Sequence, residues 1–186
     1  AYSEFFNIVG PSGIGLIDKI DFKEIETSSS SVSVLTGGTV RKREKINLMV
    51  VPGFTISEST LSPSQLSEGT FKTLALIFNL VTDKSSMLMI EEPEVCVHHG
   101  LLNSIIELIN IYSKEKQIFI STHSDTVLDN VDIENVFSVK RDSSKGTIVK
   151  NISKILKNEE MKALKEYLQT EGSLGEYWKH GDLENV

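Results

Sequence analysis

The sequence predicts an α/β fold in which a parallel β-sheet follows a β-rich N-terminal segment. Two observations carry this prediction. The apolar runs 86–90 and 117–122 are typical of buried parallel strands, and a helical pattern at 101–116 lies between them. Before residue 61, apolar and polar residues alternate as they do along strands. Strand, helix, strand, helix and strand in this order, with short connections, favour a parallel sheet.

The N-terminal segment contains two strand patterns. Apolar residues recur at intervals in 16–26. In 31–51 apolar and polar residues alternate on either side of Gly37-Gly38, which predicts a hairpin turn there. We expect this segment to form a subdomain that packs on the parallel sheet. Breaks are expected at the serine run 28–31, at Pro52-Gly53 and in the polar stretch 56–65.

A helical period begins after Leu66, with Ser67-Glu68 suited to a helix N-terminus. The residues expected on its buried face are Phe71, Leu74, Ala75, Phe78 and Val81. The later elements predicted are a short helix at 124–131, strands at 135–142 and 146–152, and a helix at 159–170.

Composition restricts the class of protein. A chain of 186 residues, 39% hydrophobic and 24% charged, suits one domain with a proper core. Its net charge of -7 argues against a surface that is basic all over. Cys96 is the single cysteine, and neither a leader nor a membrane-spanning run is recognisable, so we expect a cytoplasmic protein with no membrane partner.

Polar residues follow the predicted strands at the edge where α/β proteins bind ligands. Glu91 and Glu92 end the first apolar strand, and a nucleotide-bound Mg²⁺ would offset the cost of burying both carboxylates. Side chains alternate along a strand, so one carboxylate would serve the metal and the other the attacking water. His123 follows the next strand and can donate to a γ-phosphate. Ser67 and Gly69, at a helix N-terminus, suit an anion.

Three segments in this order resemble the second half of an ABC-type ATPase of the SMC/RecF/OLD-like branch, which includes AAA family ATPases of bacterial defence systems. "LSEGT" (66–70) is similar to the signature motif, "LMIEEPEVCVHH" (88–99) to Walker B with the D-loop, and "STHSD" (121–125) to the switch histidine. The tail at 172–183 also resembles the C-terminus of such defence ATPases. The resemblance covers residues 66–182, and three motifs in order are far more specific than one.

The resemblance implies a P-loop NTPase-like lobe, with 1–60 as its β-rich segment and 61–186 holding the signature, Walker B and switch regions. ATP and Mg²⁺ would be the cofactors, sandwiched in a homodimer or between related ATPase halves. The output would be control of DNA or RNA binding or of an effector nuclease, in anti-phage defence. The residue roles that it implies are: Glu92, catalytic base; His123, switch residue; Glu91, metal side, through water; Ser67, Glu68 and Gly69, nucleotide contacts in trans; and Glu94 and His98, D-loop. His99 stands where proline is frequent.

The stretch "IVGPSGIGLI" (8–17) has the glycine spacing of a phosphate-binding loop, but Leu16 and Ile17 replace its Lys and Ser or Thr. We therefore interpret it as a strand entry with a turn. The phosphate-binding lysine is then expected from another segment or another chain. The start at Ala1, within an apparently structured stretch, suggests a C-terminal piece or one half of a split protein.

Several alternatives stay open. Cys96, His98 and His99 lack a fourth ligand at the spacing of a structural zinc site. The run 41–45 is either a DNA-facing patch or, more commonly, a solvated hairpin face. Tyr177 and Trp178 are expected to anchor the tail to the core. The rival functions are a non-hydrolysing dimerisation module, the ATPase part of an OLD-type nuclease, and a transporter subunit.

Overall fold

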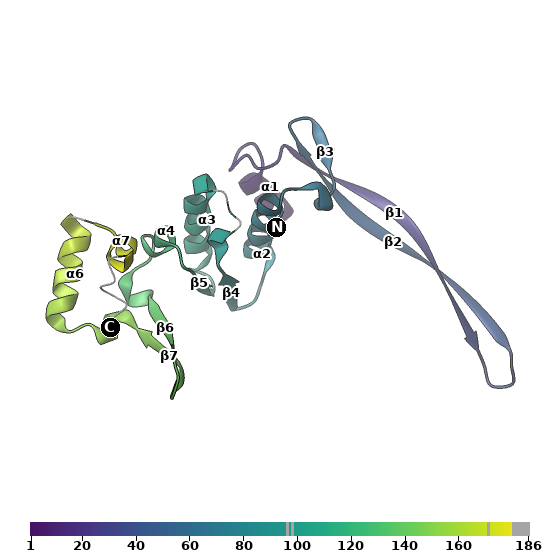
Figure 1. The fold of residues 1–186 in the computed structure, drawn as a ribbon. Helices are drawn as coiled ribbons and strands as arrows, with labels where there is room; N and C mark the ends of the chain where they lie inside the picture. The colour runs from purple at the N-terminus through teal and green to yellow at the C-terminus, as the bar shows by residue number, and fades with distance from the viewer. Residues whose placement is uncertain (96, 98, 171, 180–186) are drawn as a thin grey trace. The chain divides into compact units, whose positions relative to one another are not determined.

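The computed structural model describes residues 1–95, 97, 99–170 and 172–179. The chain divides into two compact units, Ala1–Asp83 and Lys84–Val186, whose elements are labelled in Figure 1. None of the helices in the described ranges has the length and apolar character needed to cross a bilayer.

The first unit is dominated by a long antiparallel ribbon. Helix α1 (Tyr2–Val9) precedes strands β1 (Lys19–Val34), β2 (Val40–Ile56) and β3 (Ser59–Leu61), which pair in the order β1-β2-β3. Figure 1 shows β1 and β2 as one extended two-stranded ribbon. At its tip Gly37 and Gly38 have φ angles of 101° and 80°, which glycine adopts without strain. The predicted hairpin turn is confirmed.

Two of the breaks expected in this ribbon were wrong. The serine run 28–31 lies within β1, opposite residues 43–46 of β2. Its small side chains do not end the strand because the neighbouring strand supplies a partner for each residue. Strand β2 also continues through Pro52-Gly53 to Ile56. Since β3 pairs only with 54–56, Pro52 needs no donor on that side.

Helix α2 (Glu68–Thr82) begins where the sequence predicts, with Ser67 as its N-cap. Its buried residues are Thr73, Leu74, Ile77 and Leu80. The predicted face was therefore wrong in part, because Phe71 and Phe78 are 47% and 51% exposed. The ring of Phe78 instead meets that of Phe5 from α1 edge-on, with 5.6 Å between centroids.

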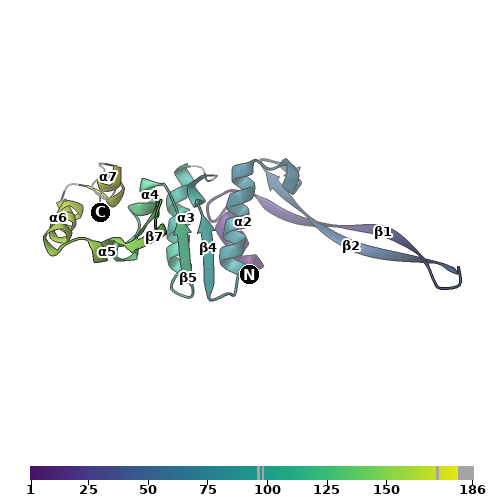
Figure 2. The same ribbon diagram turned by 60° about the horizontal axis from the view of Figure 1, so that its bottom comes forward.

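The second unit begins with the predicted parallel pair. Strands β4 (Met87–Glu91) and β5 (Gln117–Ser121) run parallel, joined through η2 (Pro93–Val95) and helix α3 (His99–Tyr112), as Figure 2 shows. On one sheet face Ile120 packs against the buried cluster of Leu102, Ile106 and Val127. The expectation of wholly buried strands was wrong, since Met89 on the other face is 74% exposed.

The third predicted strand does not join the parallel pair. Strand β6 (Phe137–Asp142) pairs antiparallel with β7 (Gly146–Asn151) in a separate two-stranded sheet. The short connection between β6 and β7 accounts for their antiparallel pairing, since a parallel pair needs a crossover of a dozen or more residues. Asp142 Oδ1 accepts bonds of 2.8 Å from the N–H groups of Ser144 and Lys145, which closes this turn.

Helices precede and follow the β6–β7 hairpin. They are α4 (Asp125–Leu128), η3 (Ile133–Asn135), α5 (Ile152–Ile155), α6 (Asn158–Thr170) and α7 (Leu174–Lys179). Their buried cluster is made of Ile133, Ile152, Leu164 and Leu174. Tyr177 and Trp178 pack against this cluster, so the prediction that they anchor the tail is confirmed.

Candidate functional site

The site is built at the carboxyl ends of β4 and β5. Glu91, the last residue of β4, lies opposite Ser121, the last residue of β5. The N–H of Glu92 donates to the carbonyl oxygen of Ser121 over 2.9 Å. This bond holds the ends of both strands together, so the residues that follow each strand share one sheet edge.

Glu92 has a strained backbone. Its φ angle is 41°, in the left-handed region that costs a residue other than glycine of order 1–3 kcal/mol. The bond to Ser121 and another from the N–H of Val95 to the Glu92 carbonyl (3.1 Å) hold it there. Strand alternation therefore ends at Glu91, and the two carboxylates differ in position because the chain turns sharply between them.

His123 lies beside Glu92. Its Nε2 is 3.7 Å from Oε1 of Glu92, and the two side chains are 91% and 41% exposed. The expectation that the two adjacent carboxylates are buried was wrong, because Glu91 is also exposed. The burial argument for a cation therefore fails. What remains is an exposed acid–imidazole pair, Glu92 with His123.

Glu94 joins the two strand-end loops. Its Oε1 accepts a 2.7 Å bond from the hydroxyl of Thr122 and a 2.9 Å bond from the N–H of His123. The Thr122 hydroxyl oxygen accepts in turn from the N–H of Ser124, over 2.9 Å. The resemblance gave Glu94 only a place in the D-loop. The structure shows that this carboxylate fixes the backbone of the histidine loop.

The other oxygen of Glu94, Oε2, is buried, and no hydrogen-bond partner for it is found among the described residues.

The described residues contain no group of three or more His, Cys, Asp or Glu side chains that could hold a metal ion. This donor set fits Mg²⁺ carried by a nucleotide, which takes one or two carboxylates and completes its shell with phosphates and water. Glu91 is the residue that would hold it, through water. Cys96 and His98 lie outside the described residues.

The signature-like residues belong to the first unit, so their geometry is described separately from that of the acid pair. Ser67 Oγ accepts from the N–H of Thr70 over 3.1 Å, which caps α2. Glu68 pairs with Lys72 at 2.8 Å, and a hydrogen bond from Lys72 lowers the pKa of its carboxyl. Gly69 follows in the first helical turn.

The stretch 8–17 is a closed turn. Its first two residues, Ile8 and Val9, end helix α1, so the expectation of a strand entry there was wrong. The N–H groups of Gly13 and Gly15 donate to the carbonyl of Gly10, both over 3.0 Å, and that of Ile14 donates to Ile8 over 2.8 Å. A phosphate-binding loop needs such groups free. The turn uses them internally, which agrees with the missing lysine.

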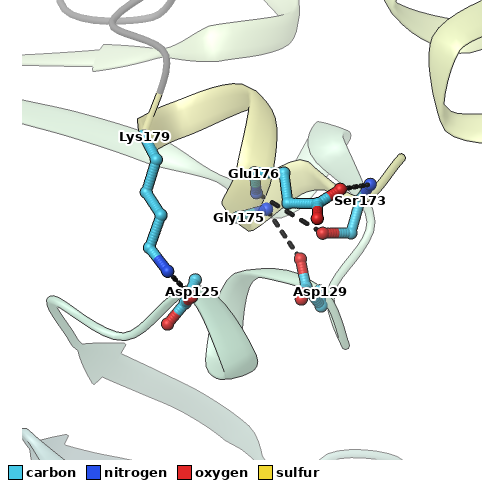
Figure 3. A network of polar contacts seen from close by, with 6 residues as sticks. All are labelled: Asp125, Asp129, Ser173, Gly175, Glu176 and Lys179. Atoms are coloured by element: carbon cyan, nitrogen blue, oxygen red, sulfur yellow. Dashed lines mark hydrogen bonds and ion pairs between the residues drawn. The ribbon is translucent and has the colours of Figure 1, made fainter. Parts of the chain in front are cut away.

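A contact that sequence reasoning missed connects the tail to α4, two residues after His123 (Figure 3). Lys179 of α7 pairs with Asp125. The hydrogen bond from Lys179 lowers the pKa of Asp125, and Asp125 raises the pKa of Lys179. The N–H of Gly175 donates to Asp129 Oδ1 over 2.6 Å.

The tail packs closely here. A Cβ at Gly175 would lie 2.6 Å from the Cα of Asp125, so a side chain at this position must displace the backbone. Ser173 and Glu176 cap α7 reciprocally, through bonds of 3.3 and 3.4 Å. Their Ser-x-x-Glu spacing is the signal in the sequence from which this helix start could have been predicted.

The comparisons with known proteins concern the family and the fold of the region that holds these residues. Residues 56–129 match the family model described as "AAA domain, putative AbiEii toxin, Type IV TA system". No curated protein matches the chain.

Three solved structures are similar. One, from work on ATP-driven dimerization and DNA-stimulated activation of SMC ATPases, is 14% identical with a TM-score of 0.49, over 91% of this chain and 89% of that one. The Smc head domain with coiled coil and joint from Pyrococcus yayanosii is 16% identical with a TM-score of 0.50, over 89% of this chain. The Smc head bound to the C-winged helix domain of ScpA is 14% identical with a TM-score of 0.51, over 83% of this chain.

The chain spans 28% and 42% of the length of the last two structures. At 14–16% identity they establish the fold alone, and they confirm the predicted α/β class with its N-terminal antiparallel segment. Residues 56–129 are therefore similar to an AAA domain, and the chain has the α/β fold of SMC heads.

Proposed function

We propose that this chain binds and hydrolyses ATP together with a second ATPase subunit, with the nucleotide held between the two. One observation carries the proposal: His123 Nε2 lies 3.7 Å from Glu92 Oε1 where two parallel strands end. This edge is the usual ligand site of an α/β sheet. The match of 56–129 to an AAA domain supports the same reaction class.

In this proposal Glu92 accepts a proton from the water whose oxygen attacks the γ-phosphorus. The bond from that phosphorus to the β,γ-bridging oxygen breaks, and ADP and phosphate leave. His123 donates a hydrogen bond to a γ-phosphate oxygen, where charge develops. When bound, Mg²⁺ would neutralise charge on the phosphates, held by Glu91 through water.

Ser67, Glu68 and Gly69 would contact the nucleotide bound to the partner subunit. Ser67 and the positive end of the α2 dipole suit an anion. The lysine that holds the phosphates would come from outside these residues, since the sequence contains no G-x-x-x-x-G-K-[ST] stretch. The output would be control of DNA binding or of a partner effector such as a nuclease, in anti-phage defence.

The test is ATP turnover and assembly of the intact protein, comparing wild type with Glu92→Gln. We expect the variant to bind ATP, to lose about 100-fold or more in turnover, and to accumulate as a dimer. Glu115→Gln is the matched control, because Glu115 is exposed in the turn before β5. If Glu92→Gln has the same turnover and assembly as Glu115→Gln, Glu91 and Glu92 are structural and the chain is a non-hydrolysing interaction module.

A further inference from the structure

The β1–β2 ribbon separates its charges by face. Residues directly opposite each other in an antiparallel pair point to the same side, and successive residues point to opposite sides. Arg41, Arg43 and Lys45 lie opposite Ser33, Ser31 and Ser29 respectively, so all six share one face. We call this the basic face, together with the next pair, Thr27 and Asn47.

The other face carries the carboxylates of this part of the ribbon. Glu44 lies there and pairs with Lys42 at 2.7 Å, and Glu26 lies two pairs further along the same face. Over residues 27–33 and 41–47 the basic face has no carboxylate. Within the described part of the chain, no ion pair is found for its three cations.

The small polar side chains of the basic face are held against the strands by hydrogen bonds. Ser33 and Ser29 donate to the carbonyls of Arg41 and Lys45 over 3.5 and 3.4 Å, and Asn47 donates to Ser29 Oγ over 3.3 Å. Every residue of this face except Asn47 is exposed. The three long cations therefore stand above a low polar surface, about 7 Å apart along the strand.

We propose that the basic face binds the phosphate backbone of duplex DNA, with the ribbon lying in the major groove. That groove is about 12 Å wide and admits a two-stranded β-ribbon. Arginine binds phosphate oxygens through its planar fork, and lysine binds them as a point charge. In a chain of net charge -7, a polyanion needs a local basic surface that excludes carboxylates, and the ribbon provides one.

A duplex of RNA fits less well, because its major groove is deep and narrow. An anionic membrane also fits less well, because the apolar residues that would enter it share their face with Glu26 and Glu44. The inference gives a surface to the DNA control in the proposed function and rests on that function for its purpose. Binding of DNA can nevertheless be measured without ATP, so the two proposals fail separately.

The experiment measures the anisotropy of a labelled DNA duplex of about 20 base pairs, two helical turns, with the whole chain over a range of salt. Each phosphate contact contributes about -0.9 to the slope of log affinity against log salt. Three contacts predict that wild-type affinity falls about 40-fold between roughly 50 and 200 mM salt.

Lys45→Gln and Lys42→Gln form the matched pair, since they make the same change three residues apart on opposite faces. We expect Lys45→Gln to make the slope shallower by about 0.9 and Lys42→Gln to leave it near the wild-type value. A triple variant, Arg41→Gln with Arg43→Gln and Lys45→Gln, should lose about 2.7 of the slope. Circular dichroism checks that each variant keeps its strand content.

Four results would overturn the proposal. Equal effects of Lys42→Gln and Lys45→Gln would mean that net charge, and not one face, attracts DNA. Tight binding of an RNA duplex of the same length would contradict binding in the major groove of DNA. Competition by polyglutamate at equal charge would assign the surface to an acidic polypeptide. Absence of salt-dependent binding by the wild type would leave the run 41–45 as an ordinary solvated face, and the proposal would be wrong.

Discussion

Glu94 connects the loop after β4 to the loop after β5 through one carboxylate oxygen. Its Oε1 accepts from the Thr122 hydroxyl and from the His123 N–H, so its removal leaves two donors without an acceptor. The side chain of His123 is itself almost fully exposed. Glu94 therefore positions His123 through the backbone and does not need to touch a substrate.

Replacement of Glu94 separates this positioning role from a charge requirement. We expect Glu94→Ala to lower the free energy of unfolding of the second unit by about 1–3 kcal/mol, because it removes the acceptor of the partly buried Thr122 hydroxyl and of the His123 N–H. Glu94→Gln should cost less, since its amide oxygen can replace Oε1 and its NH₂ group takes the place of the unpartnered Oε2. Denaturant unfolding followed by Trp178 fluorescence measures both, with the exposed Glu115→Ala as control. A Glu94→Ala midpoint equal to that of the control would contradict this role.

Single residues at the site were predictable to different degrees. Glu91, Glu92 and His123 could be identified because each lies at or just after the end of an apolar strand, and the ends of parallel strands meet at one edge. The left-handed backbone of Glu92 could not be predicted, because no glycine or asparagine marks it. The hydrogen bonds of Glu94 could not be predicted either. They join residues 28 and 29 positions apart in the sequence, and so depend on how two loops meet.

At the scale of elements, local patterns predicted most helices and strands but not their partners. The capped start of α2 and the turn at Gly37-Gly38 depend on neighbours in sequence, and both were confirmed. The pairing of β6 with β7 depends on a three-residue connection whose geometry outweighs the strand–helix alternation before it. The serine run 28–31 joined a strand because β2 was long enough to pair with it.

The docking of α7 onto α4 should depend on pH through one ion pair. The pKa of Asp125 is lowered, mainly by its hydrogen bond from Lys179, so its stabilising effect is full above the usual aspartate pKa and is lost as the pH falls through the lowered value. The pKa of Lys179 is raised, mainly by its hydrogen bond to Asp125, with smaller effects of Asp129 and Glu176. Its effect is full below the usual lysine pKa and is lost as the pH rises through the raised value.

Lys179→Met should therefore lower the unfolding midpoint reported by Trp178 at neutral pH. The difference from wild type should be constant over the neutral range and should vanish in acid and in strong alkali. Since the pair is exposed, salt should also reduce it. Lys162→Met is the control, on an exposed position of α6. A difference that persists unchanged in acid would assign the effect to packing at Gly175 and not to the ion pair.

At the scale of the whole molecule, the sequence suggested one lobe with a division near residue 60. The structure has two compact units that divide after Asp83, so α2 belongs with the ribbon and not with β4. Local patterns do not show such a division, because the apolar residues of α2 carry no sign of which elements they pack against. The signature-like residues and the acid pair therefore lie in different units.

If the two units unfold separately, a cavity made in one unit should lower the unfolding midpoint of that unit alone. Ile77 in α2 and Ile152 in α5 are both fully buried, so each change to alanine should cost about 2–5 kcal/mol where it occurs. Trp178, the single tryptophan, packs on the cluster that contains Ile152 and reports the second unit. We expect Ile152→Ala to lower the denaturant midpoint of Trp178 fluorescence, and Ile77→Ala to leave that midpoint in place while lowering the midpoint of part of the far-ultraviolet dichroism signal. If Ile77→Ala shifts the fluorescence midpoint as far as Ile152→Ala does, the chain unfolds as one cooperative domain. The acid pair and the capped start of α2 would then be coupled within one subunit, before any partner binds.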